Sequence, residues 1–105
     1  MQKLLPNYFK KIVNYDYNNN DIFTHNLLQW YKDIVFTNIN SDLLEKLDLS
    51  IYLYITDNIF QKKVKRYIKL KDINSNNNLL VNKIINLEEE YININQLKQL
   101  NSRWL

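Results

Sequence analysis

The chain has 105 residues, a formal net charge of +3, no cysteine and no glycine. Its length predicts a single globular domain with one modest core, spanning residues 1–105. The absence of cysteine excludes disulfide scaffolds, cysteine-based zinc sites and iron–sulfur clusters, and it favours a reducing compartment, an organelle matrix or the cytoplasm of a host cell.

The first half of the chain predicts helices. Residues 3–13 are expected to form a short helix, and a second short one begins at Ser41 or Asp42. Residues 21–36 give the clearest pattern, because apolar residues recur at spacings of three and four positions after Asp21, a suitable N-cap. The stripe of this helix comprises Phe23, Leu27, Trp30, Tyr31, Ile34 and Val35.

Residues 51–56 and 63–71 are predicted to form the strands of an antiparallel hairpin, joined around residues 57–58. The first segment is rich in β-branched and aromatic residues, and the second alternates apolar residues with lysines. The alternative is a single helix over residues 58–70, with Tyr67 on its buried face. Periodicity alone does not decide between the two.

Two Asn-rich segments, residues 18–20 and 74–78, are predicted to be loops, because Asn tolerates left-handed backbone conformations and can replace the missing glycine. Residues 79–90 favour a helix and residues 91–94 a short strand. A last helix is expected from Asn95. Its inward positions would be Leu97, Leu100 and Trp104. The predicted fold class is therefore α+β, mostly helical with a short antiparallel hairpin, and an all-α bundle is the alternative.

The positive charge is concentrated in one segment of the chain. Residues 51–73 contain six cations and two acids, whereas residues 1–50 contain five and six, and residues 74–105 contain three of each. A concentrated basic patch is the electrostatic pattern expected for contact with phosphates. The candidate nucleic-acid-binding cations are Lys62, Lys63, Lys65, Arg66, Lys69 and Lys71.

If the hairpin forms, three tyrosines share one of its faces with lysines of this patch. Aromatic rings among cations suit stacking on unpaired bases, which contributes about 1–3 kcal/mol per base. The competing interpretation is an ordinary solvated face, since lysine protects exposed strands from aggregation and tyrosine favours strands. The three tyrosines are Tyr52, Tyr54 and Tyr67.

The remaining polar residues do not indicate an enzyme. His25 is the only histidine, and the sequence offers it no identifiable nucleophile or orienting partner. Glu88, Glu89 and Glu90 are consecutive, so on a helix they point in different directions and do not converge on a metal. We therefore expect no catalytic residue, no metal and no cofactor. No run of about 20 apolar residues is present, so a membrane-spanning helix is not expected.

Trp104 is the candidate residue for a protein interface. A tryptophan at this position either docks onto its own domain or inserts into a partner. Aromatic residues are enriched among the side chains that dominate binding energy at interfaces.

The composition also indicates an origin and a class of function. The chain contains 18 Asn, 13 Ile and 12 Lys but neither Gly nor Ala, which indicates an A/T-rich genome such as that of an organelle or a phage. We expect a small basic, non-enzymatic protein that contacts RNA or a ribonucleoprotein. Examples are an organellar ribosomal subunit or a phage-encoded inhibitor of a host nucleoprotein nuclease, such as an anti-CRISPR. The alternative is a structural subunit of a protein assembly, for example a peripheral respiratory-complex subunit, held by apolar contacts.

Overall fold

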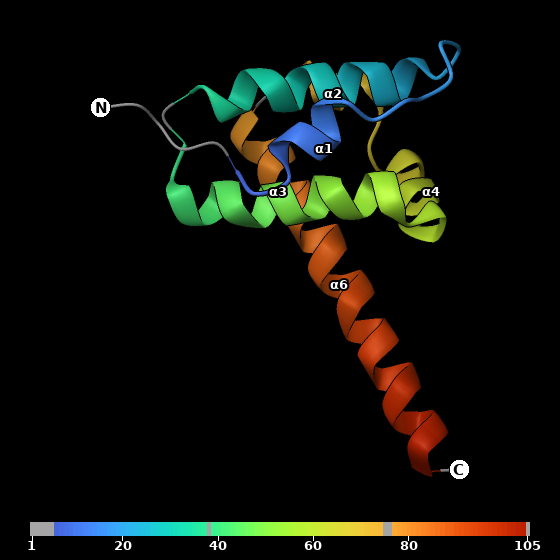
Figure 1. Ribbon diagram of the computed structural model, residues 1–105. Helices are drawn as coiled ribbons and strands as arrows, with labels where there is room; N and C mark the ends of the chain where they lie inside the picture. Colours follow the sequence, from blue (N-terminus) through green and yellow to red (C-terminus); the bar gives the residue numbers. More distant parts are fainter. Residues whose placement is uncertain (1–5, 38, 75–76, 105) are drawn as a thin grey trace.

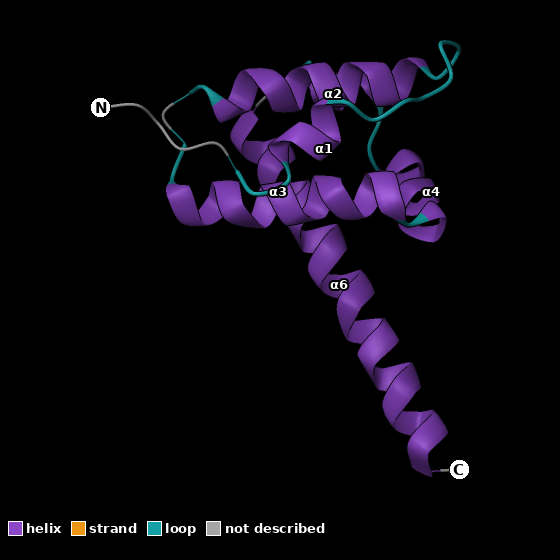
Figure 2. Ribbon diagram, in the orientation of Figure 1, coloured by secondary structure: helices purple, strands orange, loops and turns teal. Residues whose placement is uncertain are grey.

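The computed structural model is built from helices (Figures 1 and 2). The structure describes residues 6–37, 39–74 and 77–104, with side chains as far as Ile94, and none of these residues lies in a strand. The helices are α1 (Phe9–Val13), α2 (Ile22–Val35), α3 (Ser41–Thr56), α4 (Asn58–Tyr67), α5 (Leu70–Ile73) and α6 (Asn77–Trp104). The α+β prediction is therefore wrong, and the all-α alternative fits.

The predicted hairpin is the largest error. Residues 51–56 complete α3 and residues 63–67 complete α4. Asp57 is the residue at which α3 ends, and it is also the N-cap of α4. Its Oδ1 caps α4 by accepting hydrogen bonds from the backbone N–H groups of Ile59 and Phe60 at 2.9 and 3.1 Å. The helical spacing of the buried residues of α3 begins upstream of the expected strand. Those residues are Leu44, Leu47, Asp48, Ser50, Ile51 and Tyr54.

The alternative helix over residues 58–70 is closer to the structure but too long. α4 ends at Tyr67, and Ile68 follows in extended conformation. Val64 and Ile68 are both buried. A spacing of four residues puts two side chains on one face of a helix, and it also puts them on one face of a strand, which has a period of two. Tyr67, expected on the buried face, is 53% exposed.

The helix predicted over residues 21–36 is confirmed as α2. The Asp21 carboxylate caps it by accepting from the Thr24 backbone N–H at 3.0 Å. Trp30 is buried as expected, and its indole Nε1 donates to Asn77 Oδ1 at 3.0 Å. α3 begins at Ser41 as predicted, although Asn40 is the N-cap and the helix is longer than expected.

The ends of the chain and its loops differ in detail from the predictions. Of the helix expected over residues 3–13, α1 is formed, whereas residues 1–5 lie outside the part that the structure describes. The short strand expected over residues 91–94 is wrong, and the helix expected from Asn95 has no separate start, because both segments lie within α6. Residues 18–20 form a turn, closed by a 2.9 Å hydrogen bond from the Asn20 N–H to Asn18 Oδ1. Left-handed backbone is not used there, nor at any other described residue.

The second Asn-rich segment is shorter than predicted. α6 begins at Asn77, so a helix starts inside the expected loop of residues 74–78. Residues 75–76 are outside the described ranges. Asn77 has a tertiary role as the acceptor of the Trp30 hydrogen bond, which joins the start of α6 to α2.

α2 and α3 are antiparallel and are tied by polar side chains at two levels. The Tyr31 hydroxyl donates to Asp48 Oδ1 at 2.6 Å, and Thr24 Oγ1 lies 2.5 Å from the Tyr54 hydroxyl. α1 packs against both helices and lies between them (Figure 1). The first part of α6 packs against α3, α4 and α5, and the helix then leaves the domain (Figure 1).

Alkaline unfolding tests this core. Burial and the nearby Asp48 carboxylate raise the pKa of Tyr31. Burial also raises the pKa of Tyr54, and the nearby Asp21 carboxylate acts in the same direction. The unfolded chain loses these protons from its ordinary pKa of 10.0 upward while the folded chain keeps them. The free energy of unfolding is therefore expected to be undiminished below that pH and to fall above it by about 1.4 kcal/mol per pH unit for each group.

Urea unfolding followed by circular dichroism across the alkaline range measures this slope. Tyr31→Phe and Tyr54→Phe are each expected to reduce it, whereas Tyr67→Phe, at an exposed position, is the matched control that leaves it unchanged. If all three variants have the same slope, the buried hydroxyls of Tyr31 and Tyr54 are not its cause.

Candidate interaction surfaces

Most of the predicted cations are exposed along α4 and the segment that follows it. Lys62 and Arg66 are exposed and four residues apart, so they are neighbours on one helix face. The Arg66 guanidinium lies 5.9 Å from the centroid of the Tyr67 ring. We define the basic surface as Lys62, Lys63, Arg66, Lys69 and Lys71, of which Lys63 is half-buried and the others exposed.

Two of the three predicted tyrosines do not reach the basic surface. Tyr54 is 1% exposed and belongs to the core. Tyr52 stacks on Tyr8 with ring centroids 4.1 Å apart and an interplanar angle of 14°, and Lys11 Nζ lies 5.7 Å from the Tyr52 centroid. The stacking platform of three tyrosines depended on the hairpin and is not formed. On α3, the Tyr52 ring stacks on Tyr8 at the start of α1, and the Tyr54 hydroxyl bonds to Thr24 on α2.

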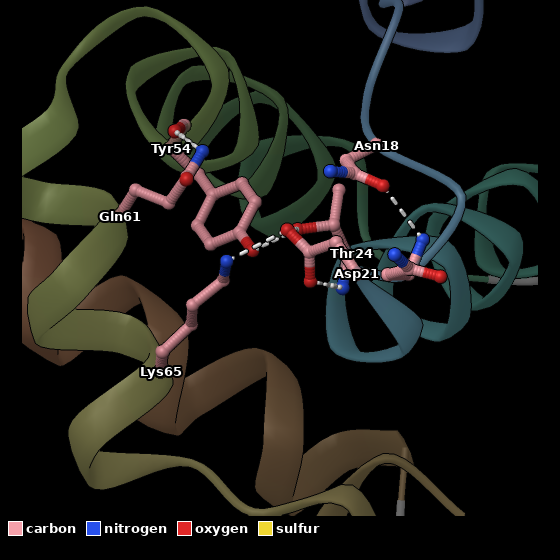
Figure 3. A network of polar contacts seen from close by, with 7 residues as sticks. Asn18, Asp21, Thr24, Tyr54, Gln61 and Lys65 are labelled. Carbon is pink, nitrogen blue, oxygen red and sulfur yellow. Dashed lines mark hydrogen bonds and ion pairs between the residues drawn. The ribbon is translucent and has the colours of Figure 1, made fainter.

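Lys65 is not part of the basic surface, because its side chain belongs to a polar network at the start of α2 (Figure 3). Its Nζ lies 2.7 Å from Asp21 Oδ2, the same oxygen that accepts from Thr24 Oγ1 at 2.6 Å. Since the Thr24 hydroxyl proton goes to the carboxylate, the Tyr54 hydroxyl donates to Thr24. The network therefore holds α2, α3 and α4 together.

The charge of Asp21 is stabilised within this network. Burial by itself raises the pKa of Asp21, but the bonds from Lys65 and Thr24 outweigh it and the pKa is lowered. The sequence indicated Asp21 as an N-cap but not its partners. The spacing from Asp21 to Thr24 was the available local signal, whereas Lys65 is 44 residues away in the chain.

A second polar junction ties α6 to the start of α4. The Tyr91 hydroxyl donates to Asp57 Oδ2 at 2.8 Å, and the Tyr91 and Phe60 ring centroids are 5.4 Å apart. Burial raises the pKa of Asp57, but the N–H groups of Phe60 and Ile59 and the Tyr91 hydroxyl outweigh it and lower the pKa. The Asp57 carboxylate thus ties the start of α4 to the middle of α6, and the Asp57 backbone N–H donates to the Leu53 carbonyl at the end of α3.

Beyond Tyr91, α6 projects away from the domain (Figure 1). Ile92 and Ile94 are 37% and 40% exposed, and Asn93 between them is exposed. The helix continues to Trp104, whose side chain, predicted to be an interface residue, lies outside the described residues. We call residues 92–104 the projecting end of α6.

A groove lies where the projecting end meets the domain. It is formed by Tyr67 at the end of α4 and by four residues of α6, and its volume is about 310 Å³. Leu87 lines it with an apolar side chain, and Lys83 lines it with a cation whose Nζ is 3.6 Å from Asp72 Oδ2. The α6 residues that line the groove are Lys83, Asn86, Leu87 and Glu90.

The other candidate residues are placed apart from these surfaces. His25 Nδ1 is 2.8 Å from the Tyr17 hydroxyl on the exposed side of α2. Glu88 is half-buried, and burial together with the neighbouring Glu89 raises the pKa of Glu88. Within the described residues, no three His, Asp or Glu side chains gather in a way that would hold a metal ion. The helices of the described part include none with the length and apolar character needed to cross a membrane.

Comparison with protein-family models, with curated proteins and with solved structures finds no match to this chain.

The Asp21 network yields a stability prediction. Asp21→Ala removes the cap of α2 and the bridge to Lys65, and it is expected to lower the free energy of unfolding by about 1–2 kcal/mol. Lys65→Gln removes only the half-exposed bridge and is expected to cost less than about 1 kcal/mol. Because the pKa of Asp21 is lowered on folding, its contribution is present above the ordinary value of 3.8 and is lost as the pH falls below it.

Chemical denaturation at neutral and at acidic pH checks both effects, with Asp16→Ala at an exposed position as the control. The difference between Asp21→Ala and the wild type is expected to shrink in acid. A difference that stays constant from neutral to acidic pH would show that the Asp21 charge contributes nothing.

Proposed function

We propose that the protein is a non-enzymatic interaction subunit, which joins a protein assembly through the projecting end of α6. The observation that carries this proposal is the change in the surroundings of α6 at Tyr91. Up to Tyr91 the helix is held by the domain, and from Ile92 onward its described side chains are exposed. The rest of the helix extends beyond the domain (Figure 1).

The projecting end, residues 92–104, would be only marginally stable as an isolated helix in water. Short helices pay the cost of nucleation over few hydrogen bonds, and Asn and Ile form helices less readily than Ala or Leu. The projecting end contains Ile92, Ile94 and three Asn residues. Its helical structure is best explained if another surface covers it in the functional state.

The apolar side chains supply a reason for that surface to bind. Complete burial of an Ile side chain stabilises by about 1.5–3 kcal/mol, so covering the exposed part of Ile92 or Ile94 contributes about 1 kcal/mol each. In the sequence, apolar residues continue through this segment at spacings of three and four, at Leu97, Leu100 and Trp104. That pattern is typical of a helix that lies in an apolar groove of a partner.

The proposal predicts that two aspartates at the root of the projecting end disrupt the assembly. The full chain with Ile92→Asp and Ile94→Asp is expected to migrate as the free protein, whereas the wild type, tagged and purified from its native cells, migrates with a larger complex on a native gel. Circular dichroism and thermal unfolding of both proteins show whether the domain stays folded. The matched control is Lys62→Gln with Arg66→Gln, which should remain in the complex.

The opposite pattern would exclude this function. If the aspartates leave the complex intact, or if the wild type migrates alone, the projecting end is not the surface through which the protein acts.

A second candidate function is contact with the phosphate backbone of RNA through the basic surface. The observation that favours it is the exposure of four cations, Lys62, Arg66, Lys69 and Lys71, over α4 and the start of α5. Such a surface attracts phosphates without reading base sequence. The loss of Tyr52 and Tyr54 from this face removes the stacking contribution and leaves mainly an electrostatic interaction.

Fluorescence anisotropy with single-stranded RNA at several salt concentrations tests this second function. If the basic surface binds phosphates, Lys62→Gln and Arg66→Gln together should weaken binding and lower the slope of log K against log salt by about 0.7 for each lost contact. Lys10→Gln with Lys46→Gln is the control for net charge. Equal losses in the two variants would show non-specific attraction rather than a binding surface.

A further inference from the structure

The groove between α4 and α6 and the projecting end belong to the same face of one helix. The groove residues Lys83, Leu87 and Glu90 are spaced by four and three positions along α6, so they share a face. Ile94 follows four positions after Glu90 on that face and is 40% exposed. A partner that covers this face of α6 therefore meets the groove first and the projecting end next.

The groove offers a mixed apolar and charged surface. Tyr67 is 53% exposed at one side, although the Arg66 guanidinium approaches its ring. Leu87 is only partly covered by the core. A helix with apolar residues at spacings of three and four matches such a surface, because those residues form a continuous stripe. The projecting end has that spacing in its own sequence.

From Glu88 onward, charge along α6 changes sign where the helix leaves the domain, whereas Lys83, earlier in the groove, lies 3.6 Å from the Asp72 carboxylate. Glu88, Glu89 and Glu90 precede the point where the helix leaves the domain, and residues 92–104 contain Lys98 and Arg103 but no acid. Two such helices side by side in antiparallel orientation place the acidic part of each next to the basic part of the other. A parallel arrangement would place like charges together, which costs stability.

We infer that the partner of the projecting end is a second copy of this chain. In the inferred dimer the two α6 helices cross in antiparallel orientation, and the projecting end of each protomer lies over the groove of the other. Because one helix supplies both the groove and the segment that fills it, a single two-fold axis satisfies both contacts at once. This inference rests on the proposed function and specifies the partner.

Charge reversal in the full chain tests the antiparallel arrangement. Sedimentation equilibrium and light scattering are expected to show a wild-type dimer. Glu89→Lys with Glu90→Lys makes both parts of α6 basic, and Lys98→Glu with Arg103→Glu makes both parts acidic. Each pair is expected to weaken the dissociation constant of the dimer at least about tenfold, since like charges then face each other.

Two restorations make the test specific. A chain that carries all four reversals regains the complementary order and is expected to dimerise again. A mixture of the basic and the acidic variants is expected to form a heterodimer. Lys10→Glu with Lys46→Glu, which lie on α1 and α3, repeats the charge change of the acidic variant elsewhere and should leave the dimer intact. Thermal unfolding by circular dichroism confirms that each variant is folded.

The outcomes separate this inference from the proposed function. A wild-type monomer at every concentration overturns the inference, and the native complex that depends on Ile92 and Ile94 would then contain a different protein. A dimer that neither reversal weakens also overturns it, because its interface lies elsewhere or its helices are parallel. If the dimer responds as expected but the native complex survives the two aspartates, the proposed function fails while the self-association stands.

Discussion

The buried carboxylate of Asp48 determines how the first three helices come together. Asp48 is 3% exposed, and each of its oxygens accepts one hydrogen bond, from the Tyr31 hydroxyl at 2.6 Å and from the Tyr8 backbone N–H at 3.1 Å. The Tyr31 bond aligns α2 with α3, and the Tyr8 bond positions the start of α1 between them. A buried charge is costly without such partners, so the packing of the three helices and the acceptors of Asp48 are mutually dependent.

The packing of the start of α2 against the end of α3 depends on the Asp21 network. The same network determines which cations the basic surface can offer to a ligand. Lys65 is used to bind Asp21, and Tyr54 is used to bind Thr24, so neither is available to a ligand. The exposed cations of the basic surface, Lys62, Arg66, Lys69 and Lys71, lie over α4 and the start of α5. The network therefore separates the charges that hold the fold together from those that can attract a phosphate.

α6 combines two roles along its length. Its first part fills the core with Leu80, Val81, Ile84 and Ile85, and Tyr91 binds Asp57 at the edge of the domain. Beyond that point the same helix exposes apolar side chains and reverses its charge. Because a helix is stiff over this distance, the way the first part is anchored fixes the direction of the second part. The position of the surface proposed for interaction is thus a consequence of how α3 and α4 hold α6.

Some features of this protein follow from the sequence alone. The apolar spacing of residues 21–36 and the short polar side chain of Asp21 determine α2 and its cap, because both act between residues a few positions apart. The same holds for the start of α3 and for the concentration of cations in residues 51–73. The segments 51–56 and 63–71 were ambiguous, since β-branched residues and a spacing of four between Val64 and Ile68 suit either a strand or a helix. Only the tertiary structure decided them, because the residues that cover those helices, Tyr8 over Tyr52 and Tyr91 over Phe60, come from distant parts of the chain. The pairing of Lys65 with Asp21 and the groove beside Leu87 were likewise decided by packing, since contacts between remote residues have no local signature in the sequence.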